Sequence, residues 1–418
     1  MKDKPNYKYA IFSLTFILSI SVPLFSQNCL NDSTGLIPIT DLGSGFYQGY
    51  QGGRYFGSNA KPSQHIAHLD NAIANIAPLN TSGDADVNNG QVVLLSIGAS
   101  NPKTEFESFQ NMADTFSLIN PFLTLVNGCQ GGKSLQKIID PDDNYWKYVN
   151  NQLTAAGVNR LQVQLIWLEE ENTQSNNYDF PAAPKELMTQ FKALFKILLQ
   201  YYPNLQICYL NGRGYAGYVD DSSSAGNGLR YPRDYFHGWA MKWLIEDQMM
   251  GDTTLSFTSP NRKAPLLDWS SYLWADGNNP RNDGLYWECP TDVKPGDGLH
   301  WSPMGNDKAG RAIFERFYTD EEARKWFLKN SPTSVFDESK NVDFEIYPNP
   351  SNDFFLVQSN HDNIFDIYIF TTLGKLVKLE KSRTNEFIVK HNLPQGLYFL
   401  IIKTKSNKYF TTKIVISK

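Results

Sequence analysis

The fold is decided by residues 92–101, which read Val-Val-Leu-Leu-Ser-Ile-Gly-Ala-Ser-Asn. The run from Val92 to Ile97 is almost wholly apolar and does not alternate, which is typical of a strand buried on both faces of a parallel sheet. Gly98 ends the run. A sharp turn at this glycine would lift the Ser100 hydroxyl above the end of the strand, so the stretch predicts a buried strand that leads directly into a site.

The pattern of an apolar run with a polar ending returns three times along the chain. The further runs cover 122–126, 163–167 and 205–209. A helix is predicted over 187–202, because apolar residues recur there every three or four positions, and a second helix over 239–250. Strands that alternate with helices predict an α/β domain, built as a three-layer, flavodoxin-like parallel sheet with helices on both faces.

Three of the predicted strands end in segments that are polar or rich in glycine, namely 98–101, 127–132 and 169–172. In open parallel sheets the ligand lies beyond the carboxyl ends of the strands. We therefore expect these three segments to meet at one edge of the sheet and to form the site there.

The chain has 418 residues, and 38 Lys and Arg against 43 Asp and Glu give a net charge of −5. Nucleic-acid binding as a general role is excluded on this ground, because it needs a basic face that neutralises phosphates. Four cysteines without CxxC spacing argue against zinc ribbons and thioredoxin-like sites. No phosphate loop or dinucleotide motif is present either, so we expect no cofactor and no metal.

The N-terminus has the pattern of a secretory signal peptide, predicted over residues 1–26. Three lysines precede an apolar run from Ala10 to Phe25, which is short for a membrane span. We expect export and no transmembrane anchor. Export permits disulfides, and a Cys29–Cys289 pair is conceivable, whereas Cys208 lies in a strand-like run and is expected to be a buried thiol.

The chain changes character at a turn-rich linker, predicted over 331–342. Residues 343–418 carry short alternating runs separated by turns, which predicts a small antiparallel β-sandwich. This part also has ten basic and seven acidic residues, so its charge is opposite to that of the rest.

The tail resembles the C-terminal sorting domain of the type IX secretion system. The matching pieces are Tyr347-Pro348-Asn349-Pro350, Thr372-Leu373-Gly374-Lys375, Leu393-Pro394-Gln395-Gly396-Leu397-Tyr398 and Lys413-Ile414-Val415-Ile416. The resemblance implies a Gram-negative cell that exports the protein through the periplasm and the type IX machinery to the cell surface or the medium. The alternative is a carbohydrate-binding sandwich.

Two candidate catalytic groups stand out in the preceding domain. A serine hydroxyl such as that of Ser100 is a poor nucleophile until a base removes its proton. His300 is a candidate base, and Asp297 three residues earlier can fix its tautomer and stabilise its cation. The alternatives are that Ser100 caps the helix after it and that His300 caps a helix predicted over 303–318.

The blocks Gly98-Ala99-Ser100-Asn101 and Asp297-Gly298-Leu299-His300 resemble the first and last blocks of the SGNH (GDSL-like) hydrolase family, in particular its sialate O-acetylesterase-like branch. The resemblance implies an SGNH hydrolase-like catalytic domain over 27–330. In it Ser100 attacks an ester carbonyl, His300 is the general base and then the general acid, and Asp297 orients His300. It also implies an oxyanion hole formed by the Ser100 N–H, a glycine N–H of the second loop (Gly132, with Gly131 nearly as good) and an amide of the third loop.

The third loop departs from the family pattern. The branch has Gln within a Trp-x-Gln-Gly-Glu run, whereas this chain has Trp167-Leu168-Glu169-Glu170-Glu171-Asn172. A carboxylate donates a hydrogen bond only when it is protonated, and its charge would repel an oxyanion. Either Gln130 or Asn172 supplies the amide, or burial protonates Glu170. Otherwise the glutamates bind a cation or a sugar hydroxyl, or the protein is not an esterase.

Further residues are candidates for substrate binding. Aromatic rings stack on sugars, and Trp301 beside His300 is the best candidate for such a platform. Arg213, at the end of a predicted strand, can bind the carboxylate of an acidic sugar or form a structural ion pair. Asn101, Gln130 and Glu170 complete the set of candidate substrate-binding residues.

Three interpretations follow from these residues. The first is an exported serine esterase that removes acyl groups, in particular acetyl, from a glycan or a small ester. The second is a catalytically weak, glycan-binding surface protein. The third is a glycosidase with two of the three glutamates as its pair, although neighbouring residues at a strand end point in opposite directions. The sequence does not specify the acyl group, the sugar, the oligomeric state or whether the protein stays attached to the cell.

Overall fold

The computed structural model describes residues 28–220, 223–329, 344–359, 363–371, 376–382, 384–405 and 409–417. The predicted signal peptide (1–26), the predicted linker (331–342) and the turn 372–375 lie outside the described residues. Within the described residues, no helix combines the length and the apolar character that crossing a membrane requires.

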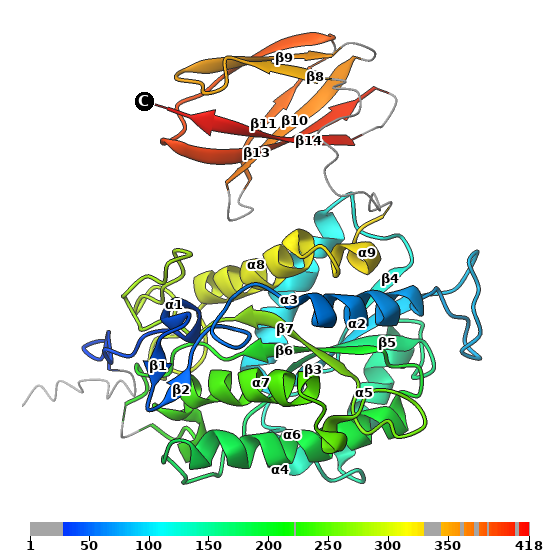
Figure 1. The fold of residues 1–418 in the computed structure, drawn as a ribbon, viewed down its shortest axis with the longest axis vertical. Coiled ribbons are helices and arrows are strands. Elements are labelled where there is room, and N and C mark those ends of the chain that lie inside the picture. The colour runs from blue at the N-terminus through cyan, green and yellow to red at the C-terminus, as the bar shows by residue number, and fades with distance from the viewer. Residues whose placement is uncertain are drawn as a thin grey trace, which may run out of the picture.

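The first unit is built on a five-stranded parallel sheet (Figure 1). Its strands are β3 (Val92–Gly98), β4 (Leu123–Asn127), β5 (Val163–Glu169), β6 (Ile207–Gly212) and β7 (Leu266–Tyr272). They lie in the order β4-β3-β5-β6-β7. Numbered within this sheet the order is 2-1-3-4-5, which is that of doubly wound sheets of the flavodoxin type.

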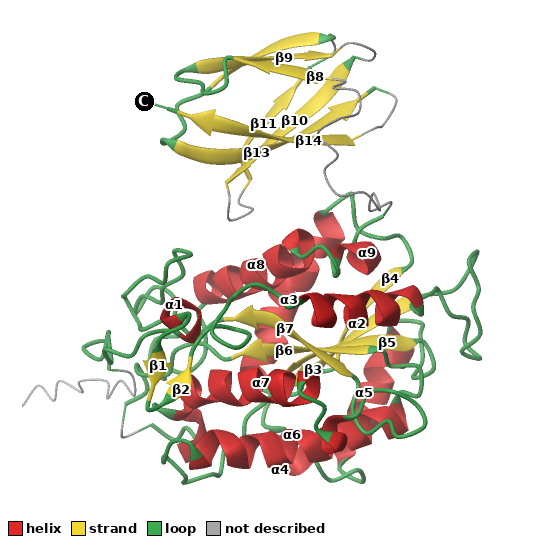
Figure 2. Ribbon diagram, viewed as in Figure 1, coloured by secondary structure: helices red, strands yellow, loops and turns green. Residues whose placement is uncertain are grey.

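Helices cover both faces of the sheet (Figure 2). One core contains the apolar sides of α4 (Leu135–Ile138), α5 (Asn144–Ala155), α6 (Ala182–Tyr201) and α7 (Arg233–Met249). The other contains those of α2 (Ser63–Ala74), α3 (Ser100–Thr115), α8 (Pro303–Thr319) and α9 (Arg324–Phe327). Consecutive residues of β3 alternate between the two cores, with Leu95 in the first and Leu94 in the second. This explains why the strand has no polar face in the sequence.

The fifth strand and the start of α7 were not predicted from the sequence, because buried charges interrupt their patterns. Asp268 lies in the middle of β7, where Lys61, His65 and Arg316 approach its carboxylate. Helix α7 begins at Arg233, six residues earlier than predicted, because its first turns carry polar side chains that are buried. The four predicted strands and the helix over 187–202 are present as β3, β4, β5, β6 and α6.

The segment before the sheet is joined covalently to the loop between β7 and α8. Cys29 and Cys289 form a disulfide, while Cys129 and Cys208 are buried free thiols. The short elements of this unit are α1 (Ile39–Leu42), β1 (Phe46–Tyr47), β2 (Tyr50–Gln51), η1 (Asn227–Leu229) and η2 (Thr253–Leu255).

The second unit consists of two antiparallel sheets around a core of its own. One sheet has the order β11-β10-β13-β14 and the other β12-β9-β8. Their bounds are β8 (Phe344–Tyr347), β9 (Phe354–Ser359), β10 (Ile364–Thr371), β11 (Leu376–Lys381), β12 (Glu386–Lys390), β13 (Gly396–Thr404) and β14 (Tyr409–Ile416).

Candidate active site

A cavity of about 520 Å³ lies at the carboxyl ends of the parallel strands. Its wall includes Ala99 to Pro102 after β3, Glu169 to Glu171 at the end of β5, and the loop with Asp297 and His300. Of the predicted segment 127–132, Gly132 alone lies in the wall. The strand ends predicted to form one site therefore do meet at this edge of the sheet.

Ser100 is the first residue of α3, and it does not cap this helix. The N-cap position is Ala99, which makes no side-chain capping hydrogen bond. The turn from β3 into α3 is tight, since a Cβ on Gly98 would lie 2.5 Å from Pro102 Cγ and 2.8 Å from the Glu169 carbonyl oxygen. This turn brings Ser100 Oγ to 2.9 Å from His300 Nε2.

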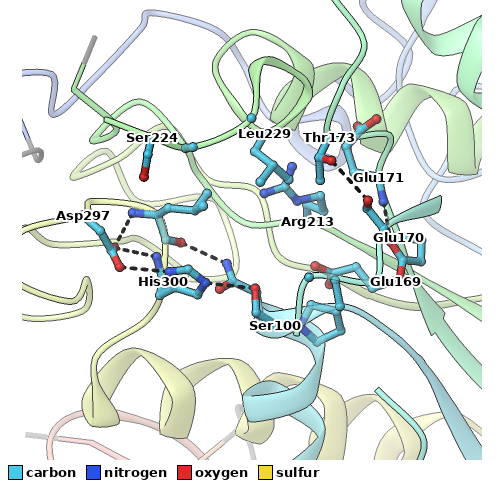
Figure 3. A pocket seen from close by; sticks show the side chains of 18 of the residues that line it. Ser100, Glu169, Glu170, Glu171, Thr173, Arg213, Ser224, Leu229, Asp297 and His300 are labelled. Atoms are coloured by element: carbon cyan, nitrogen blue, oxygen red, sulfur yellow. Dashed lines mark hydrogen bonds and ion pairs between the residues drawn. The ribbon is translucent and has the colours of Figure 1, made fainter. Parts of the chain in front are cut away.

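His300 lies in the loop before α8, and Ser302 rather than His300 caps that helix. The Nδ1 atom of His300 is 2.9 Å from Asp297 Oδ2. Asp297 Oδ1 accepts the backbone N–H groups of Leu299 and His300. Partial burial would raise the pKa of Asp297, but the hydrogen bonds from the His300 side chain and from both backbone N–H groups hold it below its usual value. Asp297 therefore stays a carboxylate that fixes the imidazole (Figure 3).

Asn101 connects the two segments that carry Ser100 and His300. Its Nδ2 donates to the Leu299 carbonyl oxygen at 2.9 Å, which ties the first turn of α3 to the loop that carries His300. Its Oδ1 is buried without a partner among the described residues. Asn101 lies in the cavity wall, so its role in substrate binding stays a prediction.

The glycines of the second loop lie beside Ser100. Gly132 has a φ of 76° with free space around it, so glycine is required there by the backbone conformation. A Cβ on Gly131 would lie 3.9 Å from Ser100 Cβ, although Gly131 is not part of the cavity wall. Gln130 is likewise absent from the wall, and its N–H donates to Gly98 O. Gln130 is therefore not placed as a substrate ligand.

The three consecutive glutamates line the cavity and are all buried. Glu169 Oε2 accepts a hydrogen bond from Asn211 at 2.6 Å, and Glu171 pairs with Arg233 at 2.7 Å. Glu170 Oε2 accepts the Glu171 N–H, while Glu170 Oε1 has no partner among the described residues. Burial raises the pKa of Glu170 well above its usual value, and the charges of Glu169 and Glu171 act in the same direction. These directions support the hypothesis that Glu170 is a neutral acid.

Trp301 and Arg213, the aromatic and the basic candidate for substrate binding, lie in different surroundings. Trp301 is 5% exposed, stacks on Trp287 with ring centroids 4.0 Å apart, and donates from Nε1 to buried Glu105. It packs behind the His300 loop and is absent from the cavity wall, so its prediction as a sugar platform is wrong. Arg213 does lie in the cavity wall, and its role in substrate binding stays a prediction.

Sequence reasoning missed His237, which connects two of the strand ends. Its Nε2 lies 2.9 Å from the Glu170 carbonyl oxygen, and its Nδ1 accepts the Arg213 N–H at 3.4 Å. Burial and the charge of Arg213 lower its pKa to about 3, so the ring is neutral and its Nε2 is the protonated nitrogen. A histidine within a helix carries no sequence signal for such a contact.

Among the described residues, no three His, Cys, Asp or Glu side chains are grouped so as to hold a metal ion.

Comparison with known proteins identifies the second unit. Residues 345–417 match the secretion system C-terminal sorting domain. The chain is therefore exported by the type IX system to the cell surface or the medium.

Relatives and solved structures match the chain over short stretches or with low TM-scores. An ulvan lyase of Nonlabens ulvanivorans is 26% identical over 99 residues, which is 23% of this chain and 18% of that protein. The type IX surface component PorZ of Porphyromonas gingivalis is 22% identical over 18% of this chain and 11% of its own, with a TM-score of 0.16. An endo-β-1,4-mannanase of Cellulomonas fimi is 7% identical over 85% of this chain and 69% of its own, with a TM-score of 0.19. These structural likenesses are too low to assign the first unit to a fold family.

Proposed function

We propose that the chain is an exported serine esterase with an SGNH-like fold, which removes acyl groups, in particular acetyl, from a carbohydrate. One observation carries the proposal. Asp297, His300 and Ser100 form a continuous line of hydrogen bonds, each 2.9 Å long, that ends on a hydroxyl in the wall of a cavity. This is the arrangement by which a base activates a serine nucleophile.

The geometry suggests how the reaction proceeds. Ser100 Oγ attacks the ester carbonyl while His300 Nε2 takes its proton, and Asp297 stabilises the imidazolium. The tetrahedral intermediate collapses when His300 returns this proton to the leaving sugar oxygen, which leaves an acyl group on Ser100. Water then attacks the acyl-enzyme with His300 again as base, which releases the carboxylic acid.

Two backbone N–H groups are proposed to stabilise the oxyanion. Ser100 begins α3, where the first backbone N–H groups have no partner within the helix. The N–H of Gly132, in the cavity wall, makes no hydrogen bond to the described part of the chain. Loss of one oxyanion donor typically lowers the rate by ~10²–10³. Because Glu169 stands where the resembled branch has glutamine, we expect modest turnover on simple aryl esters.

A carbohydrate is proposed as the substrate because of the context of the domain. The sorting domain places it outside the cell, and a protein named an ulvan lyase is among its partial relatives. A cavity of about 520 Å³ also falls in the range of small-molecule sites.

The test uses the purified protein on an aryl acetate and on an acetylated polysaccharide. Ser100→Ala is expected to abolish hydrolysis of both. Ser117→Ala, an exposed serine just beyond the opposite end of the same helix, is the matched control and should retain full activity. Full activity in Ser100→Ala would refute the proposed mechanism.

The glutamates at the third strand end favour a second candidate, a glycan-binding surface protein with little catalysis. Carboxyl groups line the cavity where an amide donor is expected. Calorimetric binding of glycans without turnover would support this candidate, and rapid hydrolysis that depends on Ser100 would exclude it.

A further inference from the structure

Arg213 differs from the other buried cations of the described chain. Four Lys or Arg residues are at least nine-tenths buried there: Arg213, Arg233, Lys242 and Arg281, with exposures of 6%, 2%, 1% and 7%. The last three each pair with a carboxylate. The guanidinium of Arg213 makes no hydrogen bond or ion pair to any described residue, and its Nη1 is buried without a partner.

An unpaired buried charge is unfavourable, which makes the isolation of Arg213 informative. Removing a cation from water costs several kcal/mol unless a partner compensates for the lost solvation. The Arg213 side chain lies in the cavity wall with Ser100 and His300. In Figure 3 it reaches into the space between the line Asp297–His300–Ser100 and the three glutamates. The cavity therefore presents a guanidinium that has no hydrogen-bond or ion-pair partner among the described residues, and that interacts through space with the charges of Glu169 and Glu171.

The neighbouring glutamates do not serve as its ion-pair partners. Glu171 is taken by Arg233, and Glu169 by the amide of Asn211. None of the described carboxylates comes within the 4.0 Å ion-pair distance of Arg213. The raised pKa of Glu170 also reduces the negative charge that an entering anion would meet.

The backbone of Arg213 is held in place by a neighbouring helix. Its backbone N–H is held by His237, whose other ring nitrogen holds the end of β5. The facing loop is braced by Arg230, which donates to the carbonyl oxygens of Asp220 and Ser223. Gly226 in this loop packs on Thr173, and both residues belong to the cavity wall. Hydrogen bonds and close packing thus hold the backbone segments on either side of the Arg213 side chain.

We propose that Arg213 forms an anion-binding subsite, which holds a carboxylate or sulfate group of the glycan whose ester Ser100 attacks. A guanidinium offers a planar fork of donors that matches both anions. The choice of an anionic glycan rests on the proposed esterase function. The anion binding itself rests on Arg213 alone and can be tested separately.

The kinetic test compares three acetylated oligosaccharides: a neutral one, one with uronic acid carboxylates and one with sulfate groups. Arg213→Gln is expected to lower kcat/KM on one or both acidic substrates by roughly 10- to 100-fold, with a change of less than about threefold on the neutral one. The acidic substrate that loses activity identifies the anion. Lys103→Gln, which removes an exposed positive charge near the start of α3 outside the cavity wall, is the matched control. Equal losses on all three substrates, or no loss, would overturn the proposal.

A binding measurement separates this inference from the esterase proposal. Calorimetry with the Ser100→Ala protein and deacetylated uronate or sulfated oligosaccharides is expected to show binding that Arg213→Gln abolishes and Arg213→Lys weakens. If no ester is hydrolysed but this binding is found, the esterase proposal fails and the subsite stands. If esters are hydrolysed but neither anionic oligosaccharide binds, the subsite fails. Tryptophan fluorescence melting confirms that each variant is folded.

Discussion

Glu170→Gln tests the electrostatic description of the cavity through the pH dependence of stability. Glu170 is 2% exposed and one of its oxygens has no partner among the described residues, so its carboxyl is expected to be protonated in the folded protein. Its pKa is raised well above the usual value of 4.5, chiefly by burial. Glutamine preserves the shape and the acceptor for the Glu171 N–H, but it does not titrate.

The sign of the effect follows from proton linkage. Below pH 4.5 the carboxyl is protonated in both the folded and the unfolded protein. Above it, the unfolded chain loses the proton while the folded protein keeps it, so wild-type stability falls as pH rises until the folded pKa is reached. One such group gives a slope of about 1.4 kcal/mol per pH unit. Between the usual carboxyl pKa and the raised pKa of the folded protein, the variant should therefore gain stability relative to wild type as the pH rises.

The assay is urea denaturation of both proteins at pH 5.5, 6.5 and 7.5. All nine tryptophans lie between Trp146 and Trp326, so their fluorescence reports on the α/β unit alone and is not affected by unfolding of the sorting domain. Glu107→Gln, an exposed carboxyl on α3, is the control for the loss of one acidic group. A stability difference between Glu170→Gln and wild type that is the same at every pH would show that Glu170 is ionised and would refute the reasoning.

Three further substitutions have expected outcomes. Asp297→Asn should lower kcat on an aryl acetate by ~10⁴, because an amide facing the imidazole stabilises the wrong tautomer; a loss below tenfold would contradict the assigned role. Trp301→Phe should lower the free energy of unfolding by about 1–3 kcal/mol in urea, because it leaves a buried Glu105 oxygen without its donor; a larger effect on substrate KM than on stability would restore the sugar platform. The double change Cys29→Ser and Cys289→Ser should cost roughly 2–4 kcal/mol, measured against wild type under non-reducing conditions, and an unchanged midpoint would show that the two cysteines are not joined.

The sorting domain and the edge of the sheet that carries the site could be predicted from the sequence, because local patterns encode them. The run from Val92 to Ile97 has no polar face, since each face of β3 meets its own helical layer. The tail carries turn and strand motifs at short spacing, and the match over 345–417 confirms the sorting domain. In both cases the information lies within a few neighbouring residues.

Strand β7 could not be predicted from the sequence, because it depends on contacts with distant residues. Its central Asp268 reads as a loop residue in the sequence, and it is tolerated in the sheet only because Lys61, His65 and Arg316 approach it from distant parts of the chain. Trp301 was misjudged in a similar way. Its neighbour His300 faces the cavity, but the indole turns to Trp287 and Glu105, and no local rule distinguishes the two directions.

The sequence by itself determined that the protein is exported, that a parallel sheet precedes the sorting domain, and that Ser100, Asp297 and His300 are the candidate catalytic groups. These properties follow from hydrophobic periodicity and short motifs, which are local. The tertiary structure alone decided that His300 Nε2 lies within hydrogen-bond distance of Ser100 Oγ, that Asn101 Nδ2 donates to Leu299 O, and that Arg213 has no ion-pair partner among the described residues. These properties depend on contacts between residues as far apart as 200 positions, whose packing and charge compensation are set only when the whole chain has folded.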